Sequence, residues 1–283
     1  MSTPTILVTG ATGNVGRPLV ASLLATRAEV RALTRDPATA NLPSDVDVTG
    51  GDYAAPAVFT GAVRRVDAVF FNIGAIRTGL EDLLAAARNA EVSKIVMLSS
   101  TTVQDEGEQT YALGTQHKVA EDAVKASGID WTILRCGGFA TNTLSWASSV
   151  RADSVVRAPY GEAATALLAE QDIAAAAARV LLDPGHVGQT YYLTGQESLT
   201  QIQQADAIGS AIGRPVRFEE LPPDAFRQFA TERFPAPVIE DMLRHWSMSV
   251  RRTADVAPDL EKLIGRQATT FARWAVQHAD AFR

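Results

Sequence analysis

The sequence predicts an α/β protein with a Rossmann-type, doubly wound parallel sheet and a smaller, mostly helical C-terminal lobe. Two observations predict this fold class. From residue 4 to about residue 135, short apolar runs alternate with helical patterns, as in the repeated strand–helix units that build a parallel sheet. Gly10, Gly13 and Gly16 also punctuate the first strand-to-helix turn, a pattern typical of folds that bind dinucleotides.

The first turn lies between an apolar strand at residues 6–8 and a helical pattern at 15–24. Gly10 can adopt the positive φ of a tight turn, Gly13 lets the backbone approach a bulky ligand, and Gly16 lets the helix pack against the strand. The helix N-terminus then offers N–H groups to a phosphate. The alternative is an ordinary corner without a ligand, but this context favours dinucleotide contacts from Gly10, Thr12, Gly13, Asn14, Val15 and Gly16.

The second strand is predicted at residues 29–34, and Arg35 follows it directly. In the dinucleotide fold this position meets the adenosine ribose. Arginine presents a bidentate fork to a 2′-phosphate, whereas an unphosphorylated ribose gives it little to pair with. Arg35 therefore predicts NADP (NADPH) in preference to NAD. The alternative is a solvated turn residue whose charge Asp36 neutralises.

Further cofactor contacts are expected where the later strands end, because an open α/β sheet binds ligands at its carboxyl edge. Asp52 follows the third strand, and it either accepts a hydrogen bond from the adenine amino group or caps the next helix. The loop after the sixth strand is expected to flank the nicotinamide. The predicted contacts at these strand ends are Asn72, Gly74, Ser99, Gly137, Gly138 and Phe139.

The composition shifts after Asn142, and residues 189–193 predict a strand that returns to the sheet. The aromatic residues between 226 and 246 indicate two or three helices, and they either line an apolar substrate pocket or only pack a core. The dinucleotide domain is therefore expected to be discontinuous. We expect the NAD(P)-binding domain at residues 1–148 and 166–198, and a substrate or partner lobe at 149–165 and 199–283.

Composition excludes several classes of partner. The 283 residues are 46% hydrophobic and 20% charged, as in a globular protein, and they contain no apolar run of about 18 residues that could cross a membrane. Met1 leads almost directly into a strand, so we expect no signal peptide and a cytoplasmic protein. The net charge of −6 argues against nucleic acid as a partner.

The cysteine and histidine content indicates no metal and no disulfide. Cys136 is the single cysteine, which fits a reducing compartment, and it is expected to be a small buried hydrophobe rather than a nucleophile. The four histidines lie far apart in the sequence, without carboxylates or cysteine at ligand spacing. We therefore expect no metal site.

The motifs together resemble the NmrA-like branch of the atypical short-chain dehydrogenases/reductases. This resemblance implies an NAD(P)-binding Rossmann domain whose nicotinamide end is covered by the C-terminal lobe. Family members include NADPH-dependent quinone and isoflavone-type reductases, and regulators that sense the nicotinamide pool. The resemblance places Lys118 beside the nicotinamide ribose, where it could stabilise an oxyanion. The residues that carry it include Gly10, Gly13, Gly16, Arg35, Asn72, His117, Lys118, Glu121, Arg135, Asn142, Asp172 and Tyr192.

One departure from the family pattern concerns proton transfer. Short-chain dehydrogenases usually carry Tyr-x-x-x-Lys, but the residue four positions before Lys118 is Gly114. Tyr111 would lie about 10 Å from Lys118 along a helix, so it is expected to be a packing residue at the helix start. The proton donor is therefore left open.

Two functions follow from these observations. The first is an NADPH-dependent reductase of a small apolar acceptor such as a quinone or enone. The alternative is a non-catalytic NADP(H) sensor that acts through protein–protein contacts. A small-molecule substrate, a protein partner and a homodimer all remain open at this point.

Overall fold

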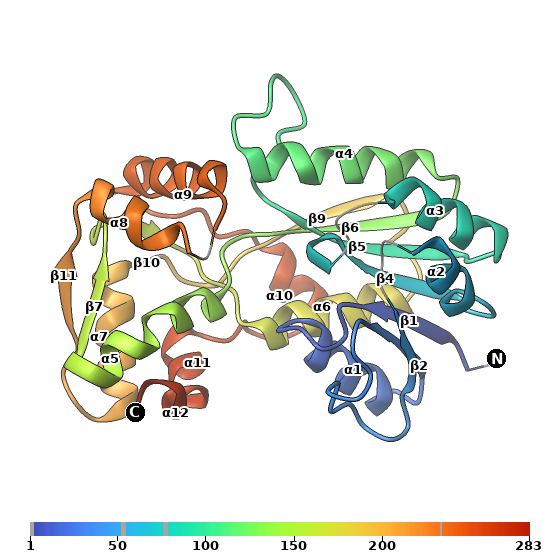
Figure 1. Cartoon of the computed structure of the whole chain (residues 1–283), viewed down its shortest axis with the longest axis horizontal. Coiled ribbons are helices and arrows are strands. Elements are labelled where there is room, and N and C mark those ends of the chain that lie inside the picture. Colours follow the sequence, from blue (N-terminus) through green and yellow to red (C-terminus); the bar gives the residue numbers. More distant parts are fainter. Residues whose placement is uncertain (1–2, 52–54, 76–78, 233) are drawn as a thin grey trace.

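The computed structural model describes residues 3–51, 55–75, 79–232 and 234–283. In this part of the chain, seven strands pair in parallel in the order β3-β2-β1-β4-β5-β6-β9 (Figure 1). The strand order reverses between β1 and β4, which creates the crevice where such sheets bind ligands. The strands are β1 (Thr5–Thr9), β2 (Glu29–Thr34), β3 (Asp47–Gly50), β4 (Ala68–Asn72), β5 (Lys94–Ser100), β6 (Asp130–Cys136) and β9 (Gln189–Leu193).

Helices cover both faces of the sheet, so the predicted doubly wound fold is confirmed (Figure 1). Side chains alternate along β1: Ile6 and Val8 pack into one core, and Leu7 packs into the other. One face is covered by α1 (Gly16–Ala25), α6 (Glu170–Leu182) and α10 (Asp259–Ile264), and the other by α2 (Pro56–Ala62), α3 (Leu80–Asn89) and α4 (Ala112–Ala126).

The C-terminal lobe lies beside the sheet, at the left of Figure 1, and it is mostly helical as predicted. Its main core is built around Ile208, Trp274 and Phe282, which are all fully buried. Two short strand pairs complete it: β7 (Val155–Ala158) with β11 (Arg217–Glu220), and β8 (Ala164–Thr165) with β10 (Leu199–Thr200). Its helices are α5 (Ala147–Asp153), α7 (Gln201–Ile212), α8 (Pro223–Ala230), α9 (Ala236–Ser249), α11 (Phe271–Gln277) and α12 (Ala279–Phe282). The predicted domain boundaries stay a prediction.

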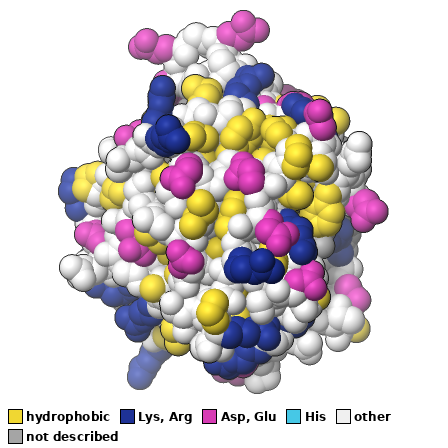
Figure 2. Space-filling view, turned by 90° about the vertical axis from the view of Figure 1, so that its left-hand side faces the viewer, with side chains coloured by type: hydrophobic (Ala, Val, Ile, Leu, Met, Phe, Trp, Pro, Cys, Tyr) yellow, Lys and Arg dark blue, Asp and Glu magenta, His cyan; other side chains and the backbone are white. Residues whose placement is uncertain are grey.

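Helices α8 and α9 form a small unit with its own core. Phe226 and Leu243 are buried there, and the Phe226 ring meets Trp246 edge-on, with 5.3 Å between ring centroids. Phe229 and Met248 are exposed instead, and Figure 2 shows hydrophobic side chains gathered over this part of the lobe, among charged ones. Core packing therefore explains the aromatic residue Phe226 but not all the aromatic residues of this region.

Buried carboxylates at the start of α6 hold the C-terminal segment in place. Asp172 accepts hydrogen bonds from the guanidinium of Arg266 and from the backbone N–H of Thr269, both at 2.5 Å. Glu170 accepts one from the indole N–H of Trp274 at 2.9 Å. These charge-assisted bonds fix the lobe to the sheet domain.

Candidate functional site

The glycine turn has the geometry that its spacing predicts. Gly10 has φ +67°, and its carbonyl accepts a hydrogen bond from the Gly13 N–H at 2.9 Å. A Cβ atom at Gly16 would lie 2.1 Å from the Gly10 oxygen, so no other residue fits there without moving the backbone. Gly13 and Asn14 are exposed, and the N-cap of α1 makes no side-chain hydrogen bond. The turn therefore presents the free end of a helix to an anion.

Arg35 lies exposed directly after β2, and in the described part of the chain its guanidinium has no hydrogen-bond or ion-pair partner. Asp36 does not neutralise it, because the Asp36 carboxylate accepts from the Ala38 N–H at 3.0 Å and from the Thr39 hydroxyl at 2.9 Å. Asp36 therefore does not pair with Arg35, whereas the choice between a phosphate contact and a solvated turn residue stays untested. Arg35 is an available cation at the edge where a 2′-phosphate would lie.

The ends of β1 and β4 are joined by hydrogen bonds at the crevice. The Thr9 hydroxyl donates to the Phe70 carbonyl at 3.0 Å and accepts from the Asn72 N–H at 2.9 Å. The Asn72 side chain in turn accepts from the Gly74 N–H at 3.0 Å. This places Asn72 and Gly74 at the expected edge, whereas Asp52 lies outside the described residues.

A buried ion-pair network lies beneath the half of the sheet edge that is formed by β5 and β6. Arg135 in β6 is 1% exposed, and its guanidinium donates to Glu121 of α4 at 2.7 and 2.9 Å. It also donates to both oxygens of Asp105, at 2.6 and 2.8 Å, and to the Tyr192 hydroxyl at 2.7 Å. Ser99 donates to Glu121 at 2.6 Å. The network ties α4, β5, β6, β9 and the loop at residues 101–111 together.

The network also sets the ionisation of its carboxylates. The hydrogen bond from Arg135 lowers the pKa of Asp105 from 3.8 to about 2. Burial by itself raises the pKa of Glu121, but hydrogen bonds from Arg135 and Ser99 outweigh it and lower the pKa. Sequence reasoning treated Ser99 as a cofactor contact and missed this network. The available signal was Arg135 itself, a charge in an otherwise apolar strand that must have a buried partner.

Helix α4 packs closely against the preceding loop at the position where short-chain dehydrogenases usually carry tyrosine. A Cβ atom at Gly114 would lie 2.5 Å from the backbone carbonyl oxygen of Thr102, so no side chain fits there unless the backbone moves. Tyr111 is the N-cap residue of α4, and the guanidinium of Arg244 in α9 lies 5.9 Å from the centre of its ring. Lys118 is partly exposed, and its ammonium contacts both oxygens of Asp122 at 2.6 and 2.7 Å.

The segment that leaves β6 lies at the same edge. Gly137 donates its N–H to the Leu193 carbonyl at 2.9 Å, and the Gly138 carbonyl accepts from the Leu168 N–H at 2.8 Å. Gly138 is exposed and Phe139 is half-buried. Cys136 is 3% exposed, and burial raises the pKa of its thiol, so it is not a reactive nucleophile.

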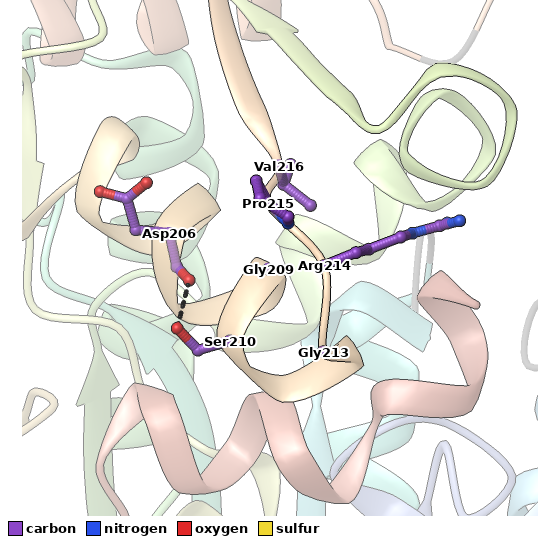
Figure 3. Close-up of a pocket in the computed structure, with 7 residues that line it drawn as sticks. All are labelled: Asp206, Gly209, Ser210, Gly213, Arg214, Pro215 and Val216. Atoms are coloured by element: carbon purple, nitrogen blue, oxygen red, sulfur yellow. Dashed lines mark hydrogen bonds between the residues drawn. The ribbon is translucent and has the colours of Figure 1, made fainter.

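A cavity of about 360 Å³ lies elsewhere, at the end of α7 (Figure 3). Ser210 donates to the Asp206 carbonyl there, and the Arg214 side chain extends away from the other lining residues (Figure 3). None of the predicted site residues lines this cavity. The described residues hold no cluster of three metal-ligating side chains, and none of their helices is long and apolar enough to span a membrane.

The reversal of strand order, the glycine turn and the helix behind it define a Rossmann-type dinucleotide-binding protein. The NmrA-like family model matches residues 2–279, so this chain belongs to the NmrA-like family.

Its relatives include named reductases. The chain is 40% identical to the (4-alkanoyl-5-oxo-2,5-dihydrofuran-3-yl)methyl phosphate reductase of Streptomyces griseus, over 98% of this chain and 99% of that protein. It is 31% identical to the NAD(P)H azoreductase of Xenophilus azovorans, over 98% and 99% of the two chains. The crystal structure of the NADPH-dependent quinone oxidoreductase of Escherichia coli in complex with NADPH superposes with a TM-score of 0.81, at 27% identity, and covers 96% of this chain and 99% of that one.

Proposed function

We propose that this protein is an NADPH-dependent reductase that transfers hydride to a small conjugated acceptor, either an enone or a quinone. The observation that carries the proposal is the full-length similarity to reductases, at 40% identity to one whose substrate is named as an acyl-substituted unsaturated lactone phosphate. In such a ring the carbon–carbon double bond is conjugated with a carbonyl group, as in an enone.

The cofactor would lie across the crevice between β1 and β4. The glycine turn from Gly10 to Gly16 would hold its pyrophosphate, and Arg35 its 2′-phosphate. When bound, NADPH supplies the hydride, while the protein positions the two reactants. Asn72, Gly74 and the residues from Gly137 to Phe139 complete the proposed contacts. We leave Ser99 out, because its hydroxyl already donates to Glu121.

Lys118 would act at the ribose end of the site. Its ammonium has three N–H donors, and Asp122 on the next turn of α4 holds it in place. A ribose hydroxyl can share these donors. Gly114 supplies no phenol at the position four residues before Lys118, but the oxygen anion formed by hydride addition to a conjugated acceptor can take its proton from water. A reductase of this substrate class therefore does not require the tyrosine.

The test is a steady-state assay of NADPH absorbance with a panel of quinones and an acyl-substituted unsaturated lactone phosphate. We expect turnover of at least one acceptor, with NADPH preferred to NADH by at least about tenfold, since charge-assisted hydrogen bonds contribute about 1.5–3 kcal/mol. NADP binding measured by calorimetry, together with an inert response across the whole panel, would contradict the proposal.

Gly114 favours a second candidate, a non-catalytic NADP(H) sensor, because proton transfer by Tyr-x-x-x-Lys is sterically closed to this chain. In that case the C-terminal lobe would bind a protein partner in a nucleotide-dependent way. Partner capture with and without NADP distinguishes the two candidates, since a reductase needs no partner whose binding depends on the nucleotide.

A further inference from the structure

Two buried polar atoms in the described part of the chain lack a hydrogen-bond partner: Nδ1 of His117 and Oγ1 of Thr141. Leaving a buried donor or acceptor unsatisfied costs about 1–3 kcal/mol. Proteins satisfy nearly all such groups, so each exception calls for an explanation, and a role in catalysis is one of them. His186 and His278 show the usual state, since Nδ1 of His186 meets the Tyr191 hydroxyl at 2.8 Å and Nδ1 of His278 meets a carbonyl at 3.0 Å.

Both residues lie on segments that follow β5 and β6, at the half of the sheet edge that we call the reactive half because the nicotinamide and its acceptor are proposed to lie there. His117 lies in α4 directly before Lys118, three residues after Gly114 and four before Glu121, so it shares the inward-facing stripe of the helix with these two buried residues. Thr141 is 9% exposed and lies in the short helix at Ala140–Trp146 that leaves β6.

The strand register places the starting points of the two segments, those that carry His117 and Thr141, side by side. β5 and β6 end side by side, with Ser100 paired to Cys136. The chain leaves β5 towards α4, which carries His117, and leaves β6 towards the segment that carries Thr141. Both segments therefore start from the edge where the nicotinamide and its acceptor are proposed to lie.

We propose that His117 and Thr141 bind the oxygen of the acceptor, taking the place of the hydroxyl that the absent tyrosine would supply. This inference rests on the proposed reductase function. Hydride from NADPH adds to the acceptor, the π-electron pair moves to the carbonyl oxygen, and that oxygen becomes an anion while NADPH becomes NADP⁺. The imidazole N–H and the threonine O–H donate hydrogen bonds to this anion, which then takes a proton from water.

The chemistry of the two side chains suits this role. Burial lowers the pKa of His117, and the negative charge of Glu121 opposes that shift only in part. The imidazole is therefore neutral, and in its Nδ1–H tautomer it is a donor without charge. Neither group needs to transfer a proton in order to stabilise the anion.

The experiment compares matched variants at both positions. Thr141→Val and His117→Leu remove the polar atom, whereas Thr141→Ser and His117→Asn keep one near the same place. We expect kcat/KM for the acceptor to fall about tenfold to hundredfold in the first pair and to recover in the second. The Kd for NADPH should stay within about twofold of the wild-type value.

Thermal unfolding separates this role from a structural one. Because the free protein leaves both atoms unsatisfied, replacing them with apolar groups should leave Tm unchanged or raise it. A lower Tm in Thr141→Val, an unchanged kcat/KM, or a loss of NADPH affinity equal to the loss of kcat/KM would each overturn the inference.

Acceptor binding to the NADP⁺ complex, measured by calorimetry, tests the contacts of His117 and Thr141 separately from the reductase function. If the wild type turns over no acceptor, the reductase proposal fails, but weaker acceptor binding by Thr141→Val than by Thr141→Ser would still support the contacts. Equal binding by the two variants, or no binding by the wild type, would overturn the inference as well.

Discussion

The sheet edge has two halves, one at the ends of β1 and β2 and the other at the ends of β5 and β6, and they are built from different kinds of groups. Around β1 and β2, the site consists of exposed backbone in one short turn, together with the exposed cation Arg35. Around β5 and β6, it rests on buried side chains far apart in sequence, held by Arg135 and Glu121. The first half suits the phosphates of a dinucleotide, which are the same whatever the acceptor, because backbone amides recognise any phosphate. The second half can be altered residue by residue, which suits an acceptor that differs between relatives.

The largest expected effect on stability concerns the buried pair of Arg135 and Glu121 beneath the reactive half. Arg135→Ala removes the two shortest ionic contacts of the fully buried Glu121 carboxylate and leaves it only Lys125, at 3.4 Å, and the Ser99 hydroxyl, so we expect the free energy of unfolding in urea to fall by about 3–5 kcal/mol. The matched control is Arg157→Ala, since Arg157 also meets two carboxylates, Asp153 and Glu219, but at the surface. That variant should lose about 1 kcal/mol or less. Equal losses of unfolding free energy in the two variants would mean that burial does not strengthen the contribution of the Arg135 ion pairs.

The backbone half is tested at its tightest contact. Gly16→Ala places a Cβ atom 2.1 Å from the Gly10 oxygen, so the turn must move. We expect a loss of about 3 kcal/mol in stability, the upper end of the overpacking range, together with weaker NADPH binding by calorimetry.

Gly61→Ala is the control for this change, because a Cβ atom there meets nothing within 4 Å. Inside α2 that substitution should stabilise the protein by up to about 1 kcal/mol. Unchanged NADPH affinity in folded Gly16→Ala would show that the turn does not hold the cofactor.

Cofactor choice depends on a single exposed cation. Arg35→Ala should reduce the preference for NADP over NAD by about tenfold to hundredfold, which corresponds to about 1.5–3 kcal/mol of charge-assisted hydrogen bonding. Calorimetry with both nucleotides measures it. Arg65→Ala, which removes an exposed arginine before β4 at the opposite edge, should leave the preference unchanged. Equal binding of NADP and NAD by the wild type would refute the role of Arg35.

The smallest effect concerns pH. Because the pKa of Asp105 is about 2 in the folded protein and ordinarily 3.8, its pair with Arg135 stabilises the fold fully above pH 4. That contribution is lost as the pH falls from about 4 to about 2. Asp105 is largely exposed, so we expect a change of about 1 kcal/mol or less after solvent screening.

Urea unfolding between pH 6 and pH 3 measures this change. Asp105→Asn should flatten the pH dependence, whereas Glu106→Gln on the same loop should not. An identical slope in wild type and Asp105→Asn would show that the 101–111 loop is not held by this ion pair.

Sequence alone predicted the elements that local patterns encode. The strands predicted at 6–8, 29–34 and 189–193 lie where the apolar runs indicate, and the glycine turn has its expected form. The support of the reactive half was not predictable in this way, because Asp105, Glu121 and Arg135 meet only once the sheet register and α4 are in place. The unpartnered atoms of His117 and Thr141 required knowledge of every neighbour, which no sequence pattern contains.

The contact between Gly114 and the Thr102 carbonyl also constrains how this chain can evolve. A substitution that introduces tyrosine at position 114 would place its Cβ atom 2.5 Å from that oxygen, so the helix or the loop would have to shift. Acquiring the Tyr-x-x-x-Lys pair therefore requires a prior change in the loop that carries Thr102.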